Sequence, residues 1–165
     1  MKITKGLFTS LTPEYSTPEW LYNKLDEEFH FNLDPCATKE NYKCPVYFTK
    51  KEDGLRQKWT GRVFMNPPYG REIYFWLKKA YESVINNDCE LVACLIPSRT
   101  DTKWFHDFCM KSNDIRFIKG RIRFKNNKPA PFPSCVVIFS RETLDPPKYI
   151  NMIKNRLDNS ILGYV

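Results

Sequence analysis

The tetrapeptide Asn66-Pro67-Pro68-Tyr69 is the segment whose residue types are best suited to chemistry. It directly follows Val63-Phe64-Met65, an apolar run that predicts a short buried strand. Two consecutive prolines fix φ and remove two backbone donors, so the turn is stiff and presents carbonyl oxygens outward. The Asn66 side-chain oxygen and the Pro67 carbonyl can therefore accept hydrogen bonds from one planar NH₂ group. Tyr69 adds a ring that can stack on a heteroaromatic base.

Two acceptors beside a stacking ring form a receptor for an amine such as the N6 amino group of adenine. Accepting both of its protons draws the nitrogen lone pair out of conjugation and makes the nitrogen a better nucleophile, with no metal or strong base required. The alternative is a structural Pro-rich turn, in which Asn66 makes an ordinary local hydrogen bond. The position of the motif, between a strand and an amphipathic helix, favours the functional interpretation.

Strand and helix patterns alternate around this motif. This alternation predicts an α/β sandwich with a mostly parallel sheet. Ligands of such sheets bind beyond the carboxyl ends of the strands, so we expect the turns after Leu33 and Met65 to share a site. The last two strands have no clear helix between them and predict an antiparallel hairpin at one edge. The expected helices are 17–30, 73–85, 102–111 and 145–159, and the expected strands are 31–34, 46–49, 63–65, 91–96, 115–118, 121–125 and 136–139.

The composition is that of a globular protein: 165 residues, 42% hydrophobic and 27% charged. This length predicts one domain over residues 1–165, with an irregular lead-in at 1–15. There is no apolar run long enough to cross a membrane and no apolar leader at the N-terminus, so we expect a cytoplasmic protein with no membrane partner. The net charge of +7 favours a polyanionic partner only mildly, because extra lysines also serve solubility.

The six cysteines and two histidines do not form the close ligand pairs of a structural zinc site. We therefore expect no metal, and free thiols that are mostly buried.

Several longer segments carry a resemblance to a known family. The chain resembles the S-adenosylmethionine-dependent amino-methyltransferases, specifically the phage-type DNA N6-adenine methyltransferases. The resemblance implies a Rossmann-like fold, S-adenosyl-L-methionine as cofactor, and DNA as partner. The matching pieces, besides Asn66-Pro67-Pro68-Tyr69-Gly70, are Ser16–Leu21, Phe31–Ala37, Glu52–Leu55 with Trp59, Leu95–Phe105, Gly120–Phe124 and Ala130–Ser134.

The resemblance also implies roles for single residues. Asn66, Pro67, Pro68 and Tyr69 match the catalytic motif that holds and activates the target adenine. Asp34 matches the acidic position that holds the amino group of the cofactor's methionine part, although a carboxylate there could also serve the turn. Asp53 matches the residue that meets the cofactor's ribose or adenine, with Glu52 as a competing candidate. The expected cofactor contacts are Thr17, Pro18, Asp34, Cys36, Asp53 and Asn66.

Thr17 and Pro18 also have a local interpretation, as N-cap and first residue of the first helix. This is compatible with a cofactor carboxylate nearby, because a helix N-terminus attracts anions. The turn after Asp34 departs from most methyltransferases because Pro35-Cys36-Ala37 contains no glycine. Asn66 follows Asp34 by only 32 residues, so one strand–helix unit between them must be abbreviated.

A basic segment near residue 120 is the candidate DNA contact. If residues 121–125 form a strand, Arg121, Arg123 and Lys125 share one face, and two apolar residues share the other. Such a row suits a phosphate backbone, and the alternative is an edge strand protected by charge. Arg99 and Lys103 are further candidates. The alternative for that segment is a helix capped by Thr100 or Asp101 and followed by a core Trp104.

Adenine N6 is hidden in a duplex, so the target base must be flipped out or presented single-stranded. The chain has no room for a separate target-recognition domain, and recognition is expected from loops at 99–103 and 125–134. The same motif could methylate RNA adenine or a protein glutamine, or the chain could be a catalytically silent nucleic-acid-binding module. We expect a monomer or weak homodimer in a bacterial or phage-infected cell, in phage protection, restriction-modification or regulation.

Overall fold

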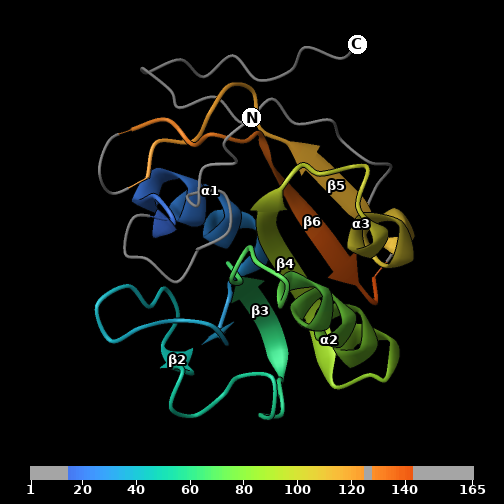
Figure 1. Ribbon diagram of the computed structural model, residues 1–165. Helices are drawn as coiled ribbons and strands as arrows, with labels where there is room; N and C mark the ends of the chain where they lie inside the picture. Colours follow the sequence, from blue (N-terminus) through green and yellow to red (C-terminus); the bar gives the residue numbers. More distant parts are fainter. Residues whose placement is uncertain (1–14, 125–127, 143–165) are drawn as a thin grey trace.

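A six-stranded sheet forms the centre of the computed structural model, which describes residues 15–124 and 128–142 (Figure 1). The strand order is β2-β1-β3-β4-β6-β5. β2, β1, β3 and β4 run parallel, whereas β6 pairs antiparallel with both β4 and β5. The predicted α/β fold with a mostly parallel sheet and an antiparallel edge is confirmed. The strands are β1 (Leu33–Asp34), β2 (Val46–Tyr47), β3 (Gly61–Met65), β4 (Cys89–Pro97), β5 (Asp114–Phe117) and β6 (Ser134–Ser140).

Helices cover both faces of this sheet. Tyr22 of α1 (Glu19–Phe29) packs against Phe64, and Tyr81 of α2 (Ile73–Ile85) packs against Phe139. Phe64 and Phe139 pair with Ala93 and Val92 of β4, which are successive residues and so point to opposite faces. α1 and α2 therefore lie on opposite sides of β4, and α3 (Lys103–Asp107) contacts α2 (Figure 1).

The ends of two helices differ from the sequence-based prediction. Pro18, and not Thr17, is the N-cap of α1, and no side chain of the described residues caps this helix. The Thr17 hydroxyl instead accepts a hydrogen bond from the Asn66 side chain. The helix predicted over 102–111 is broken: α3 ends at Asp107, and a 3₁₀ turn, η3 (Cys109–Lys111), follows after Phe108, whose φ of −124° is not helical.

The predicted strand at 121–125 was wrong. In the described residues this segment makes a single bridge, between Arg123 and Pro129, and β5 takes its place beside β6. The predicted alternation of burial still holds, because Ile122 and Phe124 are buried while the two arginines are exposed. The helix predicted at 145–159 and most of the lead-in at 1–15 lie outside the described residues.

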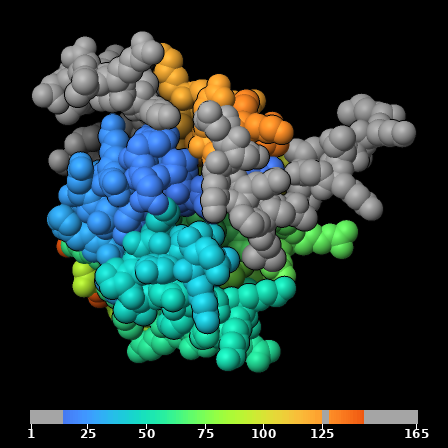
Figure 2. All heavy atoms as spheres, turned by 90° about the vertical axis from the view of Figure 1, so that its left-hand side faces the viewer, coloured from blue at the N-terminus to red at the C-terminus, as the bar shows by residue number. Residues whose placement is uncertain are grey.

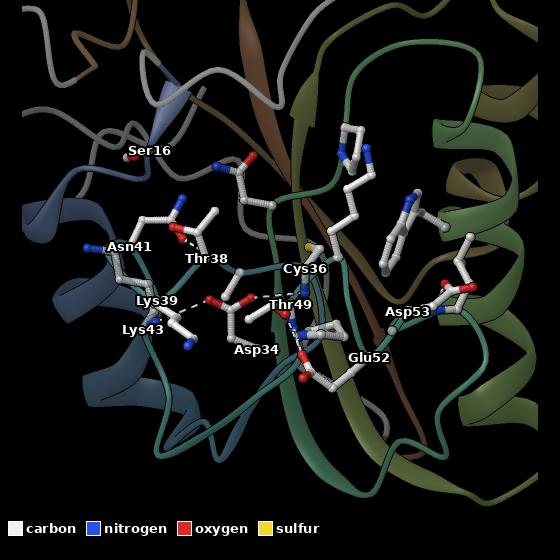
Figure 3. A pocket seen from close by; sticks show the side chains of 18 of the residues that line it. Ser16, Asp34, Cys36, Thr38, Lys39, Asn41, Lys43, Thr49, Glu52 and Asp53 are labelled. Atoms are coloured by element: carbon white, nitrogen blue, oxygen red, sulfur yellow. Dashed lines mark hydrogen bonds between the residues drawn. The ribbon is translucent and has the colours of Figure 1, made fainter.

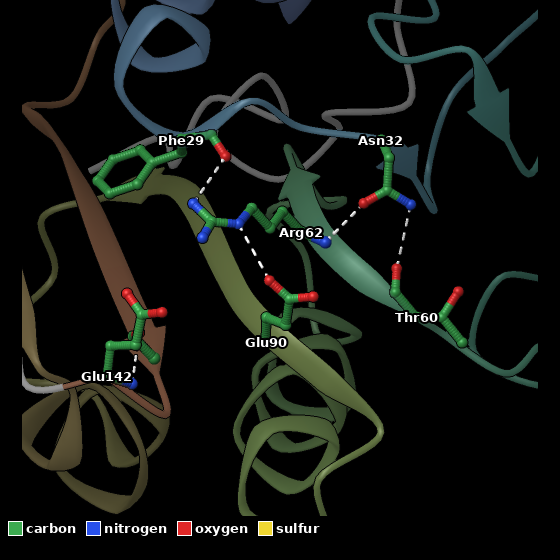
Figure 4. Close-up of polar contacts among 7 residues, drawn as sticks. Phe29, Asn32, Thr60, Arg62, Glu90 and Glu142 are labelled. Carbon is green, nitrogen blue, oxygen red and sulfur yellow. Dashed lines mark hydrogen bonds and ion pairs between the residues drawn. The ribbon is translucent and has the colours of Figure 1, made fainter.

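The chain between β1 and β3 is short and has no helix in its described residues 35–60. A strand and a helix usually lie between two such strands, but here this stretch contains only the two-residue strand β2. The short spacing between Asp34 and Asn66 predicts this. At the amino ends of β1 and β3, Asn32 accepts a hydrogen bond from the Arg62 amide at 2.6 Å and donates to the Thr60 carbonyl (Figure 4). Arg62 also pairs with Glu90 at 3.1 Å. These contacts fix the amino ends of β1 and β3.

All six cysteines are free, and five of them are buried, as predicted. Within residues 15–124 and 128–142, no group of His, Cys, Asp and Glu is arranged to hold a metal ion. No helix in the same described ranges has the length and apolar character needed to cross a membrane.

Candidate active site

A pocket of about 1160 Å³ opens at the carboxyl ends of β1 and β3. The strand order reverses here, since β2 lies on one side of β1 and β3 on the other, and such a switch point is where open α/β sheets bind ligands. The walls come from residues 15–17, the loops after β1 and β2, Asn66 and Pro68 of the tetrapeptide, and α2 (Figure 3). Pro67 and Tyr69 are not among the described residues that line it. Figure 2 shows α1 and these two loops side by side on one face of the molecule.

Asp34 lies at the end of β1, buried at the base of the pocket (Figure 3). Its two carboxylate oxygens accept hydrogen bonds from the backbone amides of Cys36 at 3.3 Å and Lys43 at 3.2 Å. Burial raises the pKa of Asp34 to about 6, and the two amides oppose this rise. A carboxylate has more acceptor sites than these amides fill, so Asp34 can still bind an ammonium group.

Asn66 follows β3 directly and reaches the same pocket. Its side-chain nitrogen donates to the Tyr15 carbonyl at 2.9 Å and to the Thr17 hydroxyl at 3.0 Å. Its side-chain oxygen accepts a hydrogen bond from the Tyr69 hydroxyl at 2.6 Å. The amide is thus held in a single orientation by three partners.

Tyr69 is buried, and its ring is surrounded by other rings. It packs edge-to-face on Phe132 at 5.4 Å between centroids and lies 6.2 Å from Tyr15. Burial raises the pKa of Tyr69 above its ordinary value, so the hydroxyl stays protonated and donates. Pro67 is buried beneath the turn, and Pro68 lines the pocket.

The loop after β2 brings both acidic candidates, Glu52 and Asp53, to the pocket. Glu52 accepts hydrogen bonds from the backbone and side chain of Thr49, which lower its pKa. Asp53 has a φ of 54°, and its carboxylate accepts from the Leu55 amide at 3.3 Å. Both carboxylates therefore shape the loop as well as facing the pocket.

Gly54 explains how this loop reaches the one after β1. A Cβ atom there would lie 1.9 Å from the Pro35 carbonyl oxygen, so only glycine permits the approach. The Gly54 carbonyl accepts from the indole nitrogen of buried Trp59 at 2.8 Å. Gly54 thus allows close contact between the loops after β1 and β2.

The other expected cofactor residues divide into two groups. Thr17 and Cys36 line the pocket, and burial raises the pKa of the Cys36 thiol well above its usual value. Pro18 caps α1 instead and is not among the described residues that line the pocket.

The arginine segment, residues 121–124, packs next to the tetrapeptide. Phe124 makes an edge-to-face contact with Tyr15 at 5.1 Å, and Tyr15 holds Asn66. Arg121 and Arg123, which flank the buried Ile122, are exposed. Lys125 lies outside the described residues.

Arg99 and Lys103 follow β4, but neither lines the pocket within the described residues. Lys103 pairs with Asp107 along α3, and its ammonium lies 5.7 Å from the ring centre of Tyr74. The N-cap of α3 is Thr102, and not Thr100 or Asp101 as in the structural alternative. Trp104 is buried in the core, as the structural alternative predicts.

Several residues that line the pocket were not among the sequence-based candidates, and Tyr15, Phe75 and Trp76 are three of them. Phe75 lies within the helix predicted at 73–85 and is 59% exposed at the pocket. Its position off the buried stripe of α2, which includes Ile73, Trp76 and Leu77, was a usable signal. The indole nitrogen of Trp76 is buried without a hydrogen-bond partner in the described structure.

The sequence of this chain matches a known protein family. The family model for the DNA N-6-adenine-methyltransferase (Dam) matches residues 8–163. The chain belongs to this family of adenine-specific DNA methyltransferases. The DNA N-6-adenine-methyltransferase of Haemophilus phage HP1 is 34% identical over 119 residues, which cover 69% of this chain and 67% of that protein. The protein of the same name from Escherichia phage T1 is 29% identical over 109 residues, 64% of this chain and 44% of that protein. The Dam-family match therefore covers the pocket, the tetrapeptide and the arginine segment.

Proposed function

We propose that this protein transfers a methyl group from S-adenosyl-L-methionine to the N6 amino group of adenine in DNA, with the target base flipped onto Asn66-Pro67-Pro68-Tyr69. The observation that carries the proposal is that Asp34 and Asn66, at the carboxyl ends of neighbouring parallel strands, line one pocket. A cofactor held at Asp34 and a base held at Asn66 would then share that space.

The pocket residues fit the cofactor in chemistry. Asp34 offers a carboxylate to the ammonium group of the methionine part, and Glu52 or Asp53 offers acceptors to ribose hydroxyls. Phe75 and Trp76 give an apolar wall for an adenine ring, and the Trp76 indole nitrogen remains as a buried donor. When bound, S-adenosylmethionine supplies an electrophilic methyl group, which is attacked by the amine of the target base.

The tetrapeptide activates the amine without a strong base. The Asn66 side-chain oxygen and the Pro67 carbonyl would each accept one N6 proton, which localises the lone pair on nitrogen. These acceptors gain most as the nitrogen becomes positive during transfer, so they stabilise the transition state more than the ground state. As the N–C bond forms, the bond between the methyl group and sulfur would break and S-adenosylhomocysteine would leave. The methylated nitrogen would then release one proton to solvent.

The target base has to leave the duplex to reach this pocket, because its N6 takes part in base pairing. Tyr69 would stack on the flipped base once its hydroxyl releases Asn66. Arg121 and Arg123 are exposed beside the tetrapeptide and would contact the phosphates that flank the flipped nucleotide. Arg99 and Lys103 would contribute only at the periphery, because they lie outside the pocket lining.

The experiment that tests the proposal is mass analysis of nucleosides from DNA of cells that express the protein and lack other adenine methyltransferases. N6-methyladenine should appear, and it should be absent with an Asn66→Ala variant. Purified protein with labelled cofactor is then offered DNA, RNA and cell protein in parallel. Label found only in RNA or only in protein glutamine would overturn the substrate assignment.

A further inference from the structure

The orientation of the Asn66 side-chain amide is dictated by its surroundings. An amide has one end that donates and one end that accepts, and the two ends look alike in shape. The Tyr15 carbonyl can only accept hydrogen bonds, so the NH₂ group of Asn66 must face it, at 2.9 Å. The side-chain oxygen must then point the other way, toward the Tyr69 hydroxyl.

Thr17 takes the second proton of that NH₂ group. Its hydroxyl oxygen lies 3.0 Å from the Asn66 nitrogen, and the Thr17 side chain is 94% buried, with 6% of its surface exposed. Both amide protons are therefore satisfied on the side away from Tyr69. Rotation of the amide by 180° would turn its oxygen toward the Tyr15 carbonyl, so this carbonyl sets the orientation, and the Thr17 hydroxyl holds the NH₂ group in it.

The hydroxyl of Thr17 would ordinarily serve the helix that follows it. A threonine just before Pro-Glu is a common N-cap, yet α1 begins with Pro18 as its N-cap and has no side-chain cap in the described residues. The hydroxyl contacts Asn66, 49 residues away, instead. Local helix stability therefore does not account for the hydroxyl at this position.

We propose that Thr17 is a positioning residue for methyl transfer: its hydroxyl, together with the Tyr15 carbonyl, holds the Asn66 amide with its oxygen toward the target amine. This inference rests on the proposed function, because it needs Asn66 to accept a proton of N6. A reversed amide would present its own NH₂ group to the N6 amino group, so two donors would meet and activation would be lost.

The test compares Thr17→Val, which keeps the shape and removes the acceptor, with Thr17→Ser, which keeps the acceptor. Thr17→Val should lower kcat about three- to tenfold, the range expected for one neutral hydrogen bond. The dissociation constant for S-adenosylmethionine should stay near the wild-type value. The melting temperature should fall by only a few degrees, because one buried amide proton loses its partner. Thr17→Ser should restore most of kcat. Thr60→Val, at the opposite end of the sheet, is the matched control. It should leave kcat, the dissociation constant and the melting temperature unchanged (Figure 4).

A wild-type kcat for Thr17→Val would overturn the inference. A loss of cofactor affinity that accounts for the whole decrease in kcat/KM would also overturn it, because the hydroxyl would then act on the cofactor directly. If Thr17→Val does not fold, kcat and the dissociation constant are measured on Thr17→Ala, whose side chain is smaller than that of threonine. Asn66→Ala is measured in parallel: an active Asn66→Ala enzyme would refute the proposed function itself, whereas an inactive one beside an unaffected Thr17→Val enzyme refutes only the positioning role.

Discussion

The hydroxyl of Tyr69 donates a hydrogen bond to the side-chain oxygen of Asn66 at 2.6 Å. This oxygen is the acceptor that the proposed mechanism assigns to the N6 amine of the target adenine. The tyrosine therefore fills one of the two acceptor sites that this amide oxygen offers. We expect the substrate amine to displace the hydroxyl when the base binds.

Replacing Tyr69 by Phe separates the ring from the hydroxyl. We expect Tyr69→Phe to keep kcat and to lower KM for DNA by about two- to tenfold, because the base no longer displaces one neutral hydrogen bond. Tyr69→Ala removes the stacking ring and should lower kcat/KM by about tenfold or more, since stacking on one base is worth about 1–3 kcal/mol. Steady-state kinetics with a short duplex measure both. A KM for Tyr69→Phe above that of the wild type would contradict the competing contact.

Replacing Asn66 by Ala removes a transition-state acceptor and little core volume. We expect kcat to fall by about 10²–10³, by analogy with the loss of one hydrogen-bonding group at a developing charge, while cofactor binding stays intact. Calorimetric titration with S-adenosylmethionine and a methyl-transfer assay give the two values. Asn86→Ala, an exposed asparagine at the end of α2, is the control and should behave as wild type.

The raised pKa of Asp34, about 6, predicts a pH dependence of cofactor affinity. An ionised carboxylate binds the ammonium group of the cofactor, and a protonated one does not. Because the pKa is near 6, Asp34 is mostly ionised above pH 7 and mostly protonated at pH 5. The apparent dissociation constant should therefore rise about tenfold between pH 7.5 and pH 5. Asp34→Asn should bind weakly at both pH values, and an equally steep pH profile in this variant would assign the titration to another group.

Neutralising Arg121 and Arg123 tests whether this segment contacts DNA. The double variant Arg121→Gln/Arg123→Gln should bind DNA more weakly and reduce the slope of log K against log salt by about one unit per lost phosphate contact. Fluorescence anisotropy at several salt concentrations measures the slope. Lys58→Gln/Lys78→Gln removes the same charge from other exposed positions and should leave the slope unchanged. If the two double variants gave equal slopes, Arg121 and Arg123 would not contact the DNA phosphates.

Arg116 is the cation whose loss should cost the most stability. Its guanidinium pairs with the buried Asp114 at 2.8 Å and with Glu28 of α1, so it joins β5 to the helix. Arg116→Met leaves Asp114 buried without its partner and should lower the free energy of unfolding by about 3–5 kcal/mol. Arg62→Met breaks the more exposed pair with Glu90 and should cost about 1 kcal/mol. Urea denaturation of both variants checks the order.

The sequence predicted most of the fold and part of the pocket lining. The apolar residues of β3 and β4 and the amphipathic pattern of α2 were strong local signals, so these elements formed where expected. The position of Asp34 and Asn66 at strand ends placed them in one pocket, because parallel strands share a carboxyl edge.

What the sequence did not show depends on long-range contacts. The Thr17 hydroxyl had two possible uses, and only the folded chain brings Asn66 within 3.0 Å of it. The segment at 121–124 alternates like a strand, but β5 already occupies the edge of the sheet, so it packs by Phe124 against Tyr15. The local periodicity of the two segments does not indicate which of them pairs with β6.

The state of the cysteines has a practical consequence for studying base flipping by fluorescence. Five of the six thiols are buried, and burial raises the pKa of the Cys89 and Cys135 thiols to about 11, so few thiolates are available to alkylating dyes at neutral pH. A reporter cysteine placed on the exposed surface would react far faster than these native thiols. Site-selective labelling should therefore need at most one native replacement, at the half-buried Cys36.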